Sequence, residues 1–161
     1  MAAKIYRCVA TFALLFAIVT MARGFAPDAP KCATPTVVDD PTYKPGQVWS
    51  YKTRAGDEDS TVTILRVEST PKLGTIVHVQ IQRWRLENCH GNTGDSTMDH
   101  APFSKAAIDK SVVKLLRTDK DIPNFEEGYR DWLSHCGGVY TMSVADALTL
   151  TNKRMKEAGC K

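Results

Sequence analysis

The sequence predicts an α+β domain, an antiparallel meander of three to four strands with one face covered by about three C-terminal helices. Runs rich in β-branched and aromatic residues follow residue 45, and patterns of helical period follow residue 103. Strands come first and helices afterwards, which is typical of a two-layer α+β domain. When the strands are paired, their apolar residues also fall on a single face.

The first 24 residues predict a cleavable signal peptide. Lys4 and Arg7 precede an apolar run at residues 8–22, which is shorter than the roughly 20 residues of a membrane helix. Small residues then favour cleavage after Gly24, with Ala22 as the alternative. We therefore expect a periplasmic or secreted protein that has no membrane anchor after cleavage.

Loss of the signal peptide changes the net charge of the chain. The full sequence has 21 Lys+Arg and 18 Asp+Glu, and residues 1–24 contain three basic and no acidic residues, which leaves 18 of each. A chain without net positive charge lacks the field that drives binding to phosphate backbones. Nucleic acid is therefore not an expected partner.

Residues 25–44 are rich in proline and predict an extended tail in front of a single α+β domain at 45–161. Within that domain, strands are expected at 47–54, 61–68 and 75–86.

Pairing Arg54 with Thr61 and Glu68 with Thr75 gives both expected hairpins the same apolar face. That face carries Trp49, Tyr51, Val62, Ile64, Val77, Val79 and Ile81. The opposite face carries Ser50, Lys52, Thr63, His78, Gln80 and Gln82. We expect an antiparallel sheet with one buried side, and a solvated His78 on the other.

Three helix patterns follow, and we expect all three helices on the apolar face. The first covers 104–117, with Ser104 as its cap and an apolar stripe of Ile108, Val112, Leu115 and Leu116. The second starts at the Asn-x-x-Glu sequence of residues 124–127 and ends before Gly137. The third runs from Ser143 to about residue 158.

Four cysteines remain after signal cleavage: Cys32, Cys89, Cys136 and Cys160. An even number in a secreted chain predicts two disulfides with three possible connectivities. We favour Cys136 with Cys160 and Cys32 with Cys89, although the sequence leaves the choice open. No CxxC pair occurs, so a structural zinc site is not expected.

Three segments carry a resemblance to other proteins: residues 45–68 (PGQVWSYKTRAGDEDSTVTILRVE), 101–104 (APFS) and 139–148 (VYTMSVADAL). The sequence resembles a group of short bacterial secreted proteins of unknown function over most of the mature chain. The resemblance implies no activity, ligand or functional residue.

The segment 87–100 concentrates nitrogen and oxygen donors that could bind a metal: His90, Asp95, Asp99 and His100. Their spacing matches no metal-binding motif, and we favour a solvated surface loop without metal or other cofactor. The sequence Ser134-His135-Cys136 is not expected to be catalytic, because Cys136 is assigned to a disulfide.

Arg83, Trp84 and Arg85 run past the end of the neighbouring hairpin, at the margin of the expected sheet. Trp84 is expected on the face opposite the helix-covered core. Because Trp and Arg are enriched in binding hot spots, these three residues are the candidate partner-binding site. The alternative, that Trp84 and Leu86 pack under the 87–100 loop, stays open.

The sequence best fits a non-enzymatic periplasmic or secreted binding protein whose partner is another protein. One version is an inhibitor or immunity protein acting on an envelope enzyme. Two alternatives stay open: a metal-dependent hydrolase that uses the 87–100 loop, and a structural or assembly protein of the cell envelope. The sequence contains no nucleophile elbow and no Gly-rich phosphate loop.

Overall fold

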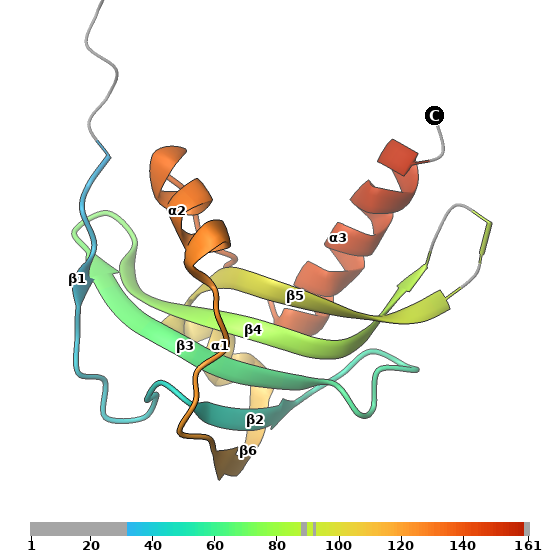
Figure 1. Ribbon diagram of the computed structural model, residues 1–161, viewed down its shortest axis with the longest axis horizontal. Coiled ribbons are helices and arrows are strands. Elements are labelled where there is room, and N and C mark those ends of the chain that lie inside the picture. The colour runs from blue at the N-terminus through green and yellow to red at the C-terminus, as the bar shows by residue number, and fades with distance from the viewer. Residues whose placement is uncertain (1–31, 88–89, 92, 160–161) are drawn as a thin grey trace, which may run out of the picture. The chain divides into compact units, whose positions relative to one another are not determined.

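The computed structural model describes residues 32–87, 90–91 and 93–159 (Figure 1). They belong to residues 31–161, the second of two units into which the chain divides. The expected signal peptide lies outside the described residues. Within the described part of the chain, no helix is both long enough and apolar enough to cross a membrane.

Six strands form one antiparallel sheet in the order β5-β4-β3-β2-β6, with β1 paired to β3. The strands are β1 (Thr36–Val37), β2 (Gln47–Tyr51), β3 (Thr61–Thr70), β4 (Gly74–Glu87), β5 (Thr93–Ser104) and β6 (Val112–Thr118). The helices are α1 (Lys105–Ser111), α2 (Glu126–Ser134) and α3 (Val144–Gly159). The α+β prediction is confirmed, with more strands than expected.

The two additional long strands lie where a loop and a helix were predicted. Most of the expected 87–100 loop belongs to β5, which pairs with β4. The expected helix at 104–117 starts as predicted, since Ser104 caps α1 by accepting from the Ala107 N–H, but it ends at Ser111. Residues 112–118 instead form β6 along the edge of β2. A short apolar run with adjacent valines fits either period, and the open edge of β2 selects the strand.

Residues 36–43 of the expected tail contact the sheet. Thr36 and Val37 pair with Ser69 and Glu68 of β3. Tyr43 is 2% exposed, and its hydroxyl donates to Asp109 in α1 at 2.8 Å. The folded unit therefore begins before residue 45.

The predicted register is wrong in the first hairpin and correct in half of the second. Trp49 pairs with Val62, four residues away from the expected alignment. A shift by an even number keeps every side chain on its face. In the second hairpin, Val62 pairs with Ile81 and Ile64 with Val79 as expected, until a bulge shifts the register by one residue.

One face of the sheet carries the apolar core, as predicted. The sheet contributes Tyr51, Val62, Ile64, Val67, Val77, Val79, Ile81, Ala101 and Phe103, and helices α1 and α3 contribute Ala107, Ile108, Val144, Ala147 and Leu148. All of these side chains are buried.

Helix α2 covers the other face, which corrects the expectation that all three helices share one side. Figure 1 shows the chain passing from β6 in front of the sheet to α2, while α1 is drawn behind the strands. Tyr129 of α2 reaches Glu68 of β3 on this polar face. His78 is consequently 0% exposed and not solvated.

A disulfide joins Cys32 to Cys136, just after α2, with 5.0 Å between the Cα atoms. The pairing favoured from the sequence, in which each of these cysteines had another partner, is therefore wrong. Cys89 and Cys160 lie outside the described residues. The bond connects two segments 104 residues apart. Local sequence patterns do not predict a pairing over such a separation.

Candidate functional site

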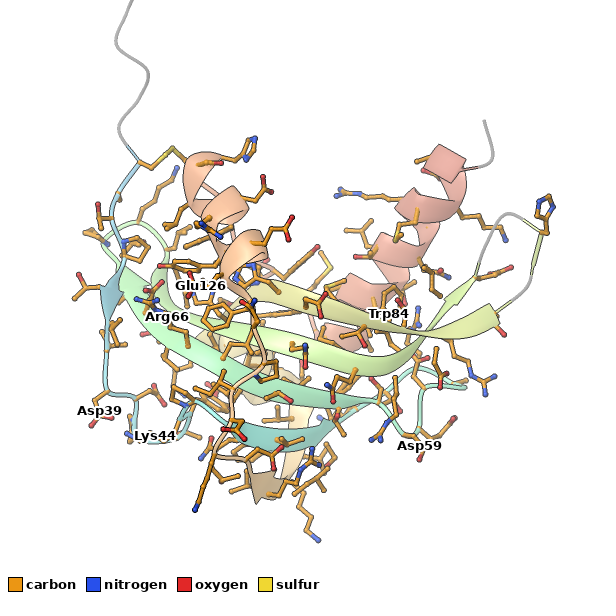
Figure 2. The ribbon with its side chains drawn as sticks, viewed as in Figure 1. Asp39, Lys44, Asp59, Arg66, Trp84 and Glu126 are labelled. Atoms are coloured by element: carbon orange, nitrogen blue, oxygen red, sulfur yellow. A yellow bond between two sulfur atoms is a disulfide. The ribbon has the colours of Figure 1, made fainter. Side chains whose placement is uncertain are left out.

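Trp84 lies on the opposite face from the one expected. The register of β4 against β5 shifts between Gln82 and Trp84, and Arg83 has a positive φ of 54°. The extra residue of this β-bulge inverts the alternation of side chains. Trp84 therefore enters the apolar core and is 2% exposed. Figure 2 shows it near α3, far along the sheet from Arg66.

The neighbouring arginines are exposed and have partners within the chain. Arg83 donates from Nε to the Asp59 carbonyl at 3.0 Å, and the Arg85 N–H donates to Asp57 at 2.8 Å. Partner binding at Arg83, Trp84 and Arg85 stays a prediction. Only the two arginines present side chains to solvent there.

The four metal candidates do not come together. His90 precedes β5, Asp95 pairs with Arg85 near the start of β5, and Asp99 and His100 lie further along that strand. No three His, Cys, Asp or Glu side chains of the described residues are placed to hold one metal ion. Asp99 and His100 nevertheless lie together at a bulge, between the pairs Val79–Ala101 and Ile81–Met98, and Asp99 accepts a hydrogen bond from Gln80 of β4.

Ser134 and His135 are exposed at the end of α2. The Ser134 hydroxyl donates to the Asp131 carbonyl at 2.8 Å, and His135 Nδ1 lies 3.1 Å from that hydroxyl. Because the hydroxyl donates to a carbonyl of its own helix and Cys136 is in a disulfide, this sequence is not arranged as a nucleophile with its base.

The described residues form a largely buried polar cluster where the sequence predicted a solvated surface. Its members are Arg66, Glu68, His78, His100 and Tyr129, and we call it the polar cluster. His78 Nδ1 lies 2.9 Å from His100 Nε2, and His78 Nε2 lies 3.2 Å from Glu68. The second contact is not aligned as a hydrogen bond. Strands β3, β4 and β5 and helix α2 each contribute to the cluster.

Glu68 is 0% exposed, and its carboxylate has two other close partners. The Tyr129 hydroxyl donates to it, with both oxygens at 2.9 Å. Arg66 Nε lies 2.6 Å from it, and the Arg66 guanidinium also lies over the Tyr129 ring at 5.0 Å. A buried carboxylate needs such partners, because an isolated charge away from water is very costly.

Burial determines the protonation of the cluster. Desolvation, followed by the nearby His100 and Arg66, lowers the pKa of His78 to about 3. Desolvation lowers the pKa of His100 to about 4. Desolvation and then the hydrogen bond to Glu68 raise the pKa of Tyr129 to about 12. At neutral pH both imidazoles and the phenol are uncharged.

Aromatic rings of α2 and the residue before it enclose the two imidazoles. Trp132 and Tyr129 meet His78 edge-on, with centroids 4.9 and 5.3 Å away, and Phe125 stacks on His100 at 6.2 Å. Gly128 allows this close approach, because a Cβ at that position would lie 2.8 Å from the His100 Cβ.

A cleft of about 490 Å³ opens above His100, between β5 and α2. We call it the acidic cleft, and it is lined by Asp99, His100, Asn124, Phe125, Glu127, Gly128 and Asp131. Three of these side chains are carboxylates and none is a lysine or arginine. The arrangement favours a positively charged ligand group, and Phe125 adds an aromatic surface.

The sequence analysis identified Asp99 and His100 as candidate metal ligands but did not predict the residues that lie next to them. Glu68, His78 and Tyr129 were assigned to a strand end, a solvated face and a core helix. The one available signal was a glycine at position 128 inside a helix pattern, which costs about 1 kcal/mol against alanine and indicates close packing.

The chain matches no protein-family model, no curated protein and no solved structure in these three comparisons. The geometry of the site is therefore the basis for the functional argument.

Proposed function

We propose that this is a non-enzymatic binding protein, acting in the periplasm or outside the cell, whose acidic cleft receives a positively charged group of a partner protein. The observation that carries the proposal is the lining of the cleft, which among the described residues has three carboxylates, an aromatic ring and no lysine or arginine. An ammonium or guanidinium group gains from both kinds of contact.

Binding is favoured over catalysis because the groups with catalytic potential are engaged inside the protein. Glu68 and His78 are 0% exposed. His100 borders the cleft, but one of its nitrogens is occupied by His78. Among the residues that the structure describes, no serine, threonine or cysteine lines the cleft to act as a nucleophile beside His100.

The protein partner would present a lysine or arginine side chain to the cleft. This chemistry is compatible with an inhibitor or immunity protein that caps an envelope enzyme, where one inserted basic side chain can serve as an anchor. The prediction for Arg83 and Arg85 concerns a separate surface, and the two surfaces can be tested independently.

The test is a titration followed by ¹H–¹⁵N NMR, using protein expressed from its full-length reading frame. The probe is a tri-arginine amide, with tri-glutamate as the opposite charge. We expect tri-arginine to shift the amide signals of residues 99–100 and 124–131, and tri-glutamate to leave them unchanged. Shifts scattered over the surface, or absent, would contradict the proposal.

Matched charge variants sharpen the result. Asp99→Asn, Glu127→Gln and Asp131→Asn together remove the carboxylates of the cleft and should abolish the response. Asp39→Asn, Asp59→Asn and Asp95→Asn remove the same number of charges elsewhere. An equal loss in both triple variants would mean that only net charge matters.

A role in envelope assembly is favoured by one observation, the exposed aliphatic residues of edge strand β6. Val113, Leu115 and Leu116 are 63%, 39% and 46% exposed, and exposed apolar edges favour association. Light scattering with chromatography tests this second proposal. A monomer at high concentration whose behaviour is unchanged by Leu116→Lys would contradict it.

A further inference from the structure

We infer that the pair formed by buried His78 and partly buried His100 makes the attachment of α2 to the sheet sensitive to acid, so that acidification releases α2 and dismantles the acidic cleft. The consequence for ligand binding rests on the proposed function. The release of α2 does not, because it follows from the contacts of the polar cluster.

Helix α2 is attached to the sheet mainly through this cluster. Tyr129 is the one buried residue of the helix. Its hydroxyl bonds to Glu68, and its ring, with Trp132, contacts His78 and His100. A change in the charge of the imidazoles therefore acts directly on the surface that holds α2.

The hydrogen bond between the two imidazoles depends on how many protons the pair carries. At 2.9 Å, one of the two facing nitrogens must donate and the other must accept. A first added proton can bind to an outer nitrogen and leave this bond intact, but it places a charge in a desolvated site. When both rings are protonated, both facing nitrogens are donors and the bond is lost.

The surrounding charges do not compensate for an added proton. From β3, Glu68 faces His78, but its carboxylate is already engaged by Arg66 and by Tyr129 of α2. From β5, Asp99 faces the cleft beside His100, and its carboxylate accepts from Gln80 of β4.

On the α2 side, Glu127 and Asp131 line the solvent side of the cleft. Even with these carboxylates nearby, burial holds the pKa of His100 at about 4. Desolvation therefore outweighs the nearby carboxylates, and the attached state disfavours protonation of both rings.

The direction of the pH effect follows from these values. Each histidine has a lower pKa in the attached state than its ordinary value of 6.5. The stabilising effect of the neutral pair is therefore complete above about pH 6.5 and is lost as the pH falls toward 4 and 3. At pH 5, linkage shifts the equilibrium toward the released state by about 30-fold for each histidine.

The disulfide limits how far α2 can move. Cys136 follows the end of the helix by two residues and is bonded to Cys32, which precedes β1 in the chain. A released α2 therefore stays close to the sheet, and return to neutral pH allows it to pack on the sheet again.

Hydrogen–deuterium exchange without ligand tests the inference. At pH 5, after correction for intrinsic exchange, amides 126–134 should lose protection relative to pH 7, while β3 and β4 keep theirs. Equal protection of α2 at both values would overturn the inference. So would a simultaneous loss in α2 and the sheet, since it would mean global unfolding.

Variants identify the responsible group. His100→Phe keeps an aromatic ring without a titrating nitrogen. Because one of two similar contributions is removed, the logarithm of the change in α2 exchange rate between pH 7 and pH 5 should fall by about half. His135→Gln removes an exposed histidine from the end of the same helix and should change nothing. A reversed outcome would overturn the assignment to the buried pair.

If His100→Phe does not fold, NMR titration of the wild-type imidazoles replaces it. The rings of His78 and His100 should stay neutral until the α2 signals change, and ring titration near pH 6.5 with α2 in place would overturn the inference. Failure of tri-arginine to bind at pH 7 would refute the proposed function alone. Tri-arginine binding that persists at pH 4.5 with α2 protected would refute the acid release alone.

Discussion

Both faces of the sheet carry buried side chains, but the chemistry of burial differs between them. Helices α1 and α3 cover one face with aliphatic and aromatic side chains. Helix α2 covers the other through an ion pair, two imidazoles and a phenol. Apolar burial does not depend on pH, whereas the polar face is stable only while its imidazoles are neutral. We therefore expect acid to leave α1 and α3 in place and to release α2 first.

The largest expected effect comes from truncating the apolar face. Phe103 is 0% exposed and its ring lies 5.0 Å from that of Tyr140. Phe103→Ala should lower the free energy of unfolding by about 3–5 kcal/mol. The matched truncation on the polar face, Phe125→Ala, starts from a half-buried ring and should cost about 1 kcal/mol. Urea denaturation of both measures the difference, and similar losses would break the comparison.

A second prediction removes the charge at the centre of the polar face. Glu68→Gln keeps the shape of the side chain but deprives Arg66 of its counter-ion and weakens the acceptor of the Tyr129 hydroxyl. We expect a loss of about 2 kcal/mol, with α2 exchanging faster than the sheet. Glu126→Gln, at an exposed position of α2, is the control and should be nearly neutral. Equal stabilities would mean that Glu68 carries no net stabilising role.

A third prediction concerns the close approach of α2 to β5. Alanine at position 128 would favour the helix by about 1 kcal/mol, but its Cβ would lie 2.8 Å from the His100 Cβ. Because overpacking costs about 1–3 kcal/mol, Gly128→Ala should give a net loss of about 1 kcal/mol and faster exchange of α2. A more stable variant would show that α2 can move away freely.

The last prediction, with an expected effect of similar size, concerns the bulge that turns Trp84 inward. Arg83 has a φ of 54°, which glycine adopts without strain. Arg83→Gly should be more stable than Arg83→Ala by about 1 kcal/mol, since both lose the bond to the Asp59 carbonyl and only alanine keeps the strain. Thermal unfolding of the pair measures this, and identical values would argue against backbone strain at the bulge.

Sequence reasoning succeeded where structure follows from local alternation. The apolar face, the pairing of Val62 with Ile81 and the capping role of Ser104 were all predictable from neighbouring residues. The first hairpin was misaligned, yet its faces were correct because the error was an even number of residues. Such features depend on the periodicity of apolar residues and on the residue types at turns and caps. Both can be identified from neighbouring residues in the sequence.

The remaining features depend on contacts that a local pattern does not encode. The bulge at Arg83 has no glycine to mark it, so Trp84 was assigned to the wrong face. His78 was expected in water, because its cover, α2, comes about 50 residues later in the chain. Residues 112–118 became a strand because β2 offered an open edge. The polar cluster could not be predicted because its members come from four separate elements.

If the chain is exported N-terminus first, as we propose, the Cys32–Cys136 bond also has a consequence for folding. Cys32 meets an oxidant early and Cys89 follows it, long before Cys136 emerges. Thiolate attack pairs whichever cysteines are accessible, so Cys32 with Cys89 is the bond that chain order favours at first. The native bond requires almost the whole domain to be present. An early Cys32–Cys89 bond would have to be exchanged before the native bond could form, and such disulfide exchange takes seconds to hours.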